Sequence, residues 1–203
     1  MSLKIRLFIL LLAGSLIVSS ITACVSNNKT IQNMAIYDFG LSNTDQNNQQ
    51  ITSKILIEEL VVAESLNNNK IRYRLNYQNP SRIYFYTESR WASAPSALFS
   101  SRLNAMATTV QNPLSCSLKL KLEAFDHVFQ TVTASEGVVQ LSVQLVEKKS
   151  RRIISSQLIS ESIPSSSPNA KGGTTALRQA SEVAIKNAVH WGNVVAEESI
   201  PCH

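Results

Sequence analysis

A cysteine near the N-terminus has the sequence context best suited to covalent chemistry. Cys24 directly follows Ile21-Thr22-Ala23, and upstream of these the cations Lys4 and Arg6 precede an apolar run, residues 7–18. Cations, an apolar run and then small residues are the order of a secretory signal. The apolar run holds 12 residues, against the roughly 20 that cross a bilayer, so we expect no permanent membrane span here.

The place of Cys24 at the expected cleavage point resembles a lipobox. In that motif the cysteine is diacylated, the preceding peptide is removed and the new N-terminus is acylated. Ile21 and Thr22 depart mildly from the leucine and small residue usual at those positions. The alternative is an ordinary secretory signal followed by a chance cysteine. Three acyl chains exceed the two signals that stable anchoring takes, so the sequence predicts a lipoprotein with signal peptide 1–23.

Two further cysteines, Cys116 and Cys202, remain once Cys24 is assigned to lipid. Thiols left over in an oxidising periplasm often pair, and this pair would tie the C-terminal tail to the middle of the domain. Two free thiols are the alternative, because the sequence does not give their separation. Cys202-His203 ends the chain without a C-x-x-C pair, so we expect no metal site and no cofactor.

The sequence lacks the residue patterns of the common catalytic sites. It contains no G-x-S-x-G, no H-E-x-x-H and no phosphate-binding glycine loop. Asp126 and His127 are neighbours in an expected strand, so their side chains point to opposite faces and cannot form a dyad. His190 lies beside Trp191, where packing or solvent explains it. We therefore expect that the protein is not an enzyme, and a hydrolase is the alternative that an activity screen would test.

The charge of the mature chain is nearly balanced. Removing residues 1–23 leaves 17 basic against 14 acidic residues, a side-chain charge of +3. The densest basic group, Lys148-Lys149 with Arg151-Arg152, falls where two strands are expected to turn. This composition does not indicate a nucleic-acid partner.

The first half of the mature chain predicts a tether, short strands and a helix. After a tether at 24–33, the domain spans 34–203, and its first elements are a strand at 34–39, a polar loop at 42–50 and a strand at 55–62, where Glu58 and Glu59 also allow helix. Period-two alternation then indicates a hairpin over 71–87 with its turn at Asn79-Pro80-Ser81. Ser93 is placed to cap a helix that has Pro95 in its first turn and runs to about Val110.

The second half carries the strongest strand patterns. Alternating apolar residues predict strands at 118–129, 139–145 and 153–163, which suggest an antiparallel meander. Thr174 or Thr175 would then cap a final helix whose apolar face is Leu177, Ala180, Ala184, Ala188, Trp191 and Val195. The order of elements predicts an α+β fold: a mainly antiparallel sheet of about six to seven strands with two long helices on one face.

Aromatic and basic residues gather around the expected hairpin and the corner that follows it. Arg90 and Trp91 sit at the corner, next to Tyr73, Tyr84 and Tyr86 on the hairpin. Trp91 could fill the core while Arg90 pairs with an acid such as Glu88. Alternatively this edge contacts a partner protein, because Tyr, Trp and Arg are enriched in interface cores.

Four segments in this order resemble a known family. They are Ile71-Arg-Tyr-Arg-Leu, Ser89-Arg-Trp-Ala-Ser-Ala-Pro, Leu122-Glu-Ala-Phe-Asp and Gly172-Gly-Thr-Thr-Ala-Leu. Together with the lipobox they resemble the ABC-type transport auxiliary lipoprotein family, to which the PqiC-type lipoproteins belong. The resemblance covers residues 34–195. The Asn/Gln-rich loop and the tail with Cys202 depart from the family pattern.

The resemblance implies a non-catalytic periplasmic lipoprotein. It implies a partner with an MCE domain in a system that moves lipids between two membranes, and it allows homo-oligomers around the transport conduit. Val25 stands where an aspartate commonly retains lipoproteins at the inner membrane, so the expected location is the periplasmic face of the outer membrane. The alternative is a structural or assembly lipoprotein that docks another envelope complex without touching lipid.

Overall fold

A computed structural model of the chain describes residues 33–41, 50–58 and 60–203. The predicted signal peptide, Cys24 and nearly all of the tether lie outside the described residues, as do residues 42–49 of the predicted polar loop at 42–50. Met34–His203 form one compact unit.

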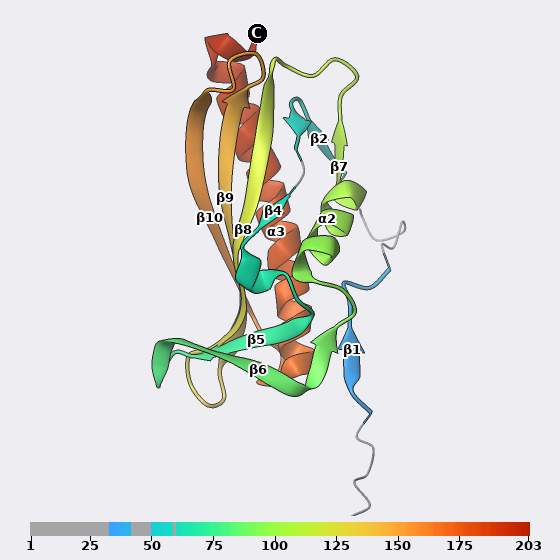
Figure 1. Ribbon diagram of the computed structural model, residues 1–203, viewed down its shortest axis with the longest axis vertical. Helices are drawn as coiled ribbons and strands as arrows, with labels where there is room; N and C mark the ends of the chain where they lie inside the picture. Colours follow the sequence, from blue (N-terminus) through green and yellow to red (C-terminus); the bar gives the residue numbers. More distant parts are fainter. Residues whose placement is uncertain (1–32, 42–49, 59) are drawn as a thin grey trace, which may run out of the picture. The chain divides into compact units, whose positions relative to one another are not determined.

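The long strand β8 is the centre of an eight-stranded mixed sheet (Figure 1). The strand order is β1-β6-β5-β8-β9-β10, and β3 and β4 pair with β8 beside β5. A separate two-stranded sheet joins β2 and β7 in parallel. The strands are β1 Ala35–Tyr37, β2 Ile51–Ser53, β3 Leu56–Ile57, β4 Val61–Val62, β5 Lys70–Leu75, β6 Asn79–Trp91, β7 Ala107–Thr109, β8 Cys116–Phe129, β9 Ser135–Glu147 and β10 Ile153–Pro164.

The meander β8–β9–β10 forms as the alternation predicts, with both pairs antiparallel. Along β9 every second residue is buried from Ser135 to Leu145, while the residues between them are half-buried. The buried side faces helix α3, Ala170–Glu198, which packs against β8, β9 and β10. Gly137 on β9 permits this approach, because a Cβ there would lie 2.4 Å from the backbone nitrogen of Leu177.

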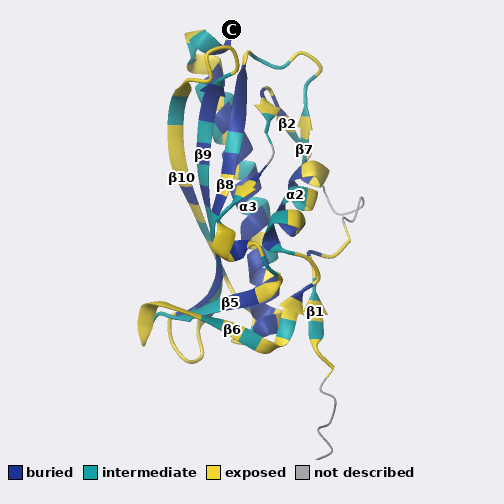
Figure 2. Ribbon diagram, in the orientation of Figure 1, coloured by how far each residue is buried: buried dark blue, intermediate teal, exposed yellow. Residues whose placement is uncertain are grey.

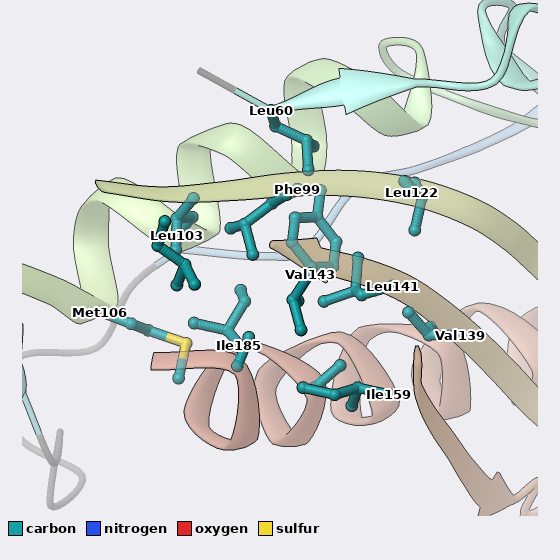
Figure 3. Close-up of a cluster of buried hydrophobic side chains, with 14 of the residues drawn as sticks. Leu60, Phe99, Leu103, Met106, Leu122, Val139, Leu141, Val143, Ile159 and Ile185 are labelled. Atoms are coloured by element: carbon teal, nitrogen blue, oxygen red, sulfur yellow. The ribbon is translucent and has the colours of Figure 1, made fainter. Parts of the chain in front are cut away.

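One hydrophobic core joins the sheet to both helices (Figure 3). Helix α2, Pro95–Met106, contributes Phe99 and Leu103, which are at most 4% exposed. Helix α3 contributes Ile185 and a row of alanines, Ala176, Ala180, Ala184 and Ala188, all at most 1% exposed. Small side chains on this face let the helix approach the sheet closely.

The fold class is therefore the predicted α+β, with differences in the first half of the chain. The expected single strand at 55–62 is two short strands, β3 and β4, and the side chain of Leu60, which lies between them, is buried in the core. Glu58 N and Ala63 N still donate to Leu118 O and Leu122 O of β8, so the segment runs parallel to that strand. The sheet has more strands than expected and contains parallel pairs.

Both helices begin or end away from the predicted positions. Helix α2 starts after Ala94 without any side-chain cap, so Ser93 does not cap it, and the chain becomes extended after Met106 rather than near Val110. Helix α3 begins at Ala170, before the predicted threonine caps. The side chain of Asn169 accepts a hydrogen bond from Gly172 N at 3.0 Å, which is standard N-cap chemistry.

The β5–β6 hairpin also forms, with its turn earlier than predicted. Residues 76–78 make the turn, where Gln78 N donates to Leu75 O at 2.9 Å, and Asn79 and Pro80 already belong to β6. Pro80 lies near the start of the strand, where a missing backbone N–H is tolerated.

A disulfide joins Cys116, the first residue of β8, to Cys202 in the C-terminal 3₁₀ turn Ile200–Cys202. The two Cα atoms are 5.0 Å apart and both residues are 0% exposed. Ser115 N also donates to Cys202 O at 2.7 Å. The C-terminal tail is thereby fixed to the start of the central strand, as the pairing hypothesis required.

We expect the double substitution Cys116→Ala/Cys202→Ala to lower the free energy of unfolding by about 2–4 kcal/mol. The bridge closes a loop of 86 residues, so its loss enlarges the conformational entropy of the unfolded chain. Urea unfolding at neutral pH measures the change. Dithiothreitol should lower the stability of the unsubstituted protein similarly and leave the double variant unchanged; an equal effect on both proteins would contradict the assignment.

Candidate functional site

The aromatic residues of the hairpin form a stack on one of its faces. The ring of Tyr73 on β5 lies 5.2 Å from Tyr84 and 4.8 Å from Tyr86, both on β6, and 6.0 Å from Phe129 at the end of β8. Such offset and edge contacts stabilise aromatic pairs beyond the area they bury. The three predicted tyrosines therefore come together and are half-buried against the end of β8.

Trp91 and Arg90 are neighbours in the chain but lie in different environments. The side chain of Trp91 is 1% exposed and packs against Phe39 and Phe125, with ring centroids 5.9 and 5.4 Å away. It belongs to the core, so it offers no free surface to a partner. Arg90 is exposed, and no ion pair joins it to Glu88 among the residues the structure describes. A partner interface that includes Arg90 and the tyrosines stays a prediction.

A buried ion cluster lies on the other face of the hairpin. Arg72 Nε is 2.8 Å from Asp126 Oδ1, and Arg74 Nε is 2.7 Å from Asp126 Oδ2. The side chains of Arg72 and Asp126 are 6% and 3% exposed. Burial lowers the pKa of Arg72, while the charge of Asp126 acts in the opposite direction. One carboxylate thus balances two guanidinium groups, and this cluster holds β5 against β8.

His127 is the hub of a buried hydrogen-bond network. Its Nδ1 lies 2.8 Å from the hydroxyl of Tyr86, and its Nε2 lies 3.1 Å from the hydroxyl of Ser165, just after β10. Burial lowers the pKa of His127 to about 4 and raises the pKa of Tyr86. The imidazole is therefore neutral at physiological pH. One ring nitrogen carries the proton and donates it, and the other accepts.

This network resembles a serine–histidine pair, but its surroundings suit packing. His127 is 0% exposed. Gly173 of α3 approaches it so closely that a Cβ on Gly173 would lie 2.4 Å from Nδ1 of His127. Phe129 covers it with ring centroids 4.5 Å apart. The group that orients the imidazole is a phenol instead of a carboxylate. What the arrangement does is join three distant segments: β6, β8 and the loop before α3.

Sequence reasoning did not identify these polar clusters. The signal for the ion cluster was Asp126 close to the apolar residues Phe125 and Val128 near the end of its strand, because a carboxylate buried there requires a cationic partner. Arg72 and Arg74 carried a weaker signal, since they alternate with Ile71 and Tyr73 on a half-buried strand. Asp126 and His127 do face opposite sides, as the strand assignment predicted.

Within the described part of the chain, no three histidine, cysteine, aspartate or glutamate residues gather in a way that could hold a metal ion. None of the described helices is both long and apolar enough to span a bilayer.

These features define an α+β domain in which a buried polar junction fastens an aromatic hairpin to a disulfide-linked meander. No protein-family model matches the sequence, and no curated protein matches it. Solved structures share the fold. A crystal structure of a Xanthomonas campestris protein, assigned to the family model DUF330, is similar with a TM-score of 0.64 and 16% identity, covering 81% of this chain and 98% of that chain.

Two further structures are more distant. A protein described only as uncharacterized is similar with a TM-score of 0.53 and 12% identity, covering 80% of this chain and 99% of that chain. A candidate lipoprotein from Caulobacter crescentus has 14% identity and a TM-score of 0.36, over 70% of this chain and 92% of that chain. The similarities to the Xanthomonas campestris protein and to the uncharacterized protein show a shared fold. The similarity to the Caulobacter crescentus protein is too low to support an argument.

We expect Asp126→Asn to lower the free energy of unfolding by about 3–5 kcal/mol, because it leaves the buried guanidinium of Arg72 and the partly buried guanidinium of Arg74 with no counter-charge. The substitution preserves side-chain volume, so the loss is electrostatic. Glu123→Gln on the same strand is the matched control. It breaks a surface pair with Lys121, which is worth about 1 kcal/mol or less. Equal losses in urea unfolding would contradict a structural role for the cluster.

We expect the stability of the protein to fall between pH 6.5 and pH 4 through His127. The pKa is about 4 in the folded state, so the unfolded chain takes up this proton first and stability is complete only above pH 6.5. The loss over that range is roughly 3 kcal/mol. Urea unfolding at several pH values should show a shallower pH dependence for His127→Gln. Parallel curves for both proteins would contradict the assignment.

Proposed function

We propose that this chain is an exported lipoprotein, anchored through Cys24 to the periplasmic face of the outer membrane. There it serves as a non-catalytic accessory subunit of an MCE/ABC-type system that transports lipids between membranes. The observation that carries the proposal is the state of the cysteines. Cys116 and Cys202 are joined inside the domain, which suits an oxidising compartment and leaves Cys24, of the three cysteines in the chain, for acylation.

The packing of the four family-like segments supports the resemblance. Residues 71–75 lie in β5, residues 89–95 end β6 and begin α2, residues 122–126 lie in β8, and residues 172–177 lie in α3. These segments meet at one junction. Trp91 contacts Phe125, Arg72 and Arg74 contact Asp126, and Gly173 packs on the adjacent His127. The four segments therefore belong to one packed junction of the domain.

The sheet also offers a means for copies of the chain to associate. Strand β10 ends the strand order, so one of its edges has no partner strand within the described domain. It is 12 residues long, and its only charged residue is Glu161. Long edges with little charge can pair with another chain. Homo-oligomerisation through this edge is part of the proposal, in keeping with the resemblance.

The proposal predicts that an MCE-domain protein will co-purify with this protein from membranes. A tag placed after the exposed His203 leaves the domain and the leader intact. Detergent-extracted membranes from cells grown with labelled palmitate supply the sample. We expect one labelled species that sediments with the outer membrane and brings the MCE protein with it.

Cys24→Ser should abolish the label and release the protein from membranes, while Thr22→Ala, which places a small residue two positions before the cysteine, should behave like the unsubstituted protein. An unlabelled protein that stays on membranes would overturn the anchor. A labelled protein that brings down a different envelope complex would favour the structural or assembly role instead.

A further inference from the structure

The β5–β6 hairpin exposes apolar residues at one end of the domain. Both strands cross the end at which β1 begins, and Figures 1 and 2 show the tip of the hairpin projecting there, mostly exposed. Tyr77 at the turn is 43% exposed, and Ile83 and Phe85 on β6 are 37% and 42% exposed. Their aromatic and aliphatic surface belongs to none of the buried clusters described above.

The turn between β8 and β9 lies beside this tip. Asn76 N donates to Phe129 O at 2.9 Å, and the Asn76 side-chain amide is 3.5 Å from Gln130. Val132, within that turn, is 69% exposed. The tip and the turn therefore present apolar side chains at the same end of the domain.

The same hairpin concentrates positive charge. Residues 70–91 contain five of the 17 basic residues of the mature chain and one of its 14 acids, Glu88. Asp126 balances part of the charge of Arg72 and Arg74. Lys70 and Arg82 instead lie over aromatic rings, 5.2 Å from Phe85 and 4.7 Å from Tyr84.

Among the described residues, no acid forms an ion pair with Lys70, Arg82 or the exposed Arg90. Lys70 lies over the exposed ring of Phe85 and Arg82 over the half-buried ring of Tyr84, so the hairpin combines the two kinds of side chain that favour the headgroup region of a bilayer. The charge of Lys70 and Arg82 complements that of anionic lipids.

We propose that the β5–β6 hairpin rests on the surface of the membrane to which the protein is anchored, and that it binds anionic phospholipid headgroups. The proposal rests on the anchor at Cys24 proposed above. From Cys24 to Ala35, where β1 begins, the chain spans at most roughly 40 Å when fully extended. This tether keeps the end of the domain that carries the hairpin close to the bilayer, which raises the effective concentration of a weak contact.

In this arrangement Arg82, Lys70 and Arg90 contact phosphate groups, while Tyr77 and Phe85 lie at the headgroup level. Aromatic rings and the stems of basic side chains both favour that region. The hairpin would thereby set how the domain stands on the bilayer, instead of leaving it free on its tether.

The test uses the lipidated full-length protein in vesicles of phosphatidylcholine, with or without phosphatidylglycerol. A fluorophore is attached at Gln78→Cys, an exposed position in the hairpin turn. The control label is at Lys149→Cys, in the basic turn between β9 and β10, which Figure 1 shows at the opposite end of the domain. We expect the emission of the Gln78 label to shift to the blue and its quenching by aqueous iodide to fall severalfold on anionic vesicles alone.

Charge variants provide the matched comparison. Lys70→Ser/Arg82→Ser should abolish the response of the Gln78 label, while Lys148→Ser/Lys149→Ser removes the same charge from the other end and should leave it unchanged. An unresponsive Gln78 label on anchored protein, or a response only at Lys149, would overturn the proposal. An unresponsive Gln78 label would favour a protein as the partner of the hairpin. Flotation with neutral vesicles reports the anchor separately, so failure of the anchor is distinguishable from failure of the hairpin contact.

Discussion

The central constraint in this domain is that both edges of β8 must be paired. One edge bonds to β9 over its whole length, from Cys116 to Phe129. The other edge is shared in turn by the short parallel strands β3 and β4 and by the end of β5. Unpaired backbone groups in the interior are costly, so these segments supply the hydrogen bonds that a single long neighbour would have given. Strand β5 is the last of these three partners of β8, and its pairing holds the β5–β6 hairpin in place.

An irregularity in β8 decides what the strand presents to each side. The register with β9 shifts between Leu122 and Ala124, which adds one residue and reverses the alternation, as a β-bulge does. Before the shift, Leu118, Leu120 and Leu122 face the core. After it, Phe125 contacts the core and His127 contacts α3, so Asp126 turns toward the arginines of β5. Without the extra residue, the carboxylate would face the core and the aromatic ring would face outward.

The parts of the fold that local pattern determines were predictable. Alternation placed the first half of β8 and most of β9, a weaker pattern diluted by serines placed β10, and the alanine spacing placed the buried face of α3. The errors occur where distant residues decide local structure. The break between β3 and β4 coincides with the burial of Leu60, while the segment continues to hydrogen-bond along β8. Asn169 begins α3 earlier than a threonine would, because the glycines after it must pack on Ser167 and His127. Secondary-structure propensities depend on local sequence, so they do not include these long-range contacts.

Some features of the candidate site were likewise predictable from residue type, while others depend on distant contacts. Residue type suggested correctly that the tyrosines gather and that the cysteines lie close enough to bridge, but it could not show that Trp91 faces the core while its neighbour Arg90 faces solvent. That difference depends on the register of β6 against β5, which shifts between Lys70 and Arg72. The buried charges were identifiable in principle, because Asp126 lies among the apolar residues near the end of its strand. Its partners lie more than 50 residues away, beyond the reach of any local pattern.

Helix α3 connects the two ends of this architecture. Its 29 residues span about 44 Å as an ideal α-helix. Near its start, Gly173 packs on His127 beneath the hairpin. Further along, Gly192 approaches Leu118 and Ile55, and the chain then reaches Cys202 and its bridge to the start of β8. The helix and β8 are thus joined near both ends, by packing at one and by a covalent bond at the other. A hairpin mounted on such a closed frame keeps its orientation relative to the rest of the domain, so a contact made at its tip orients the whole domain.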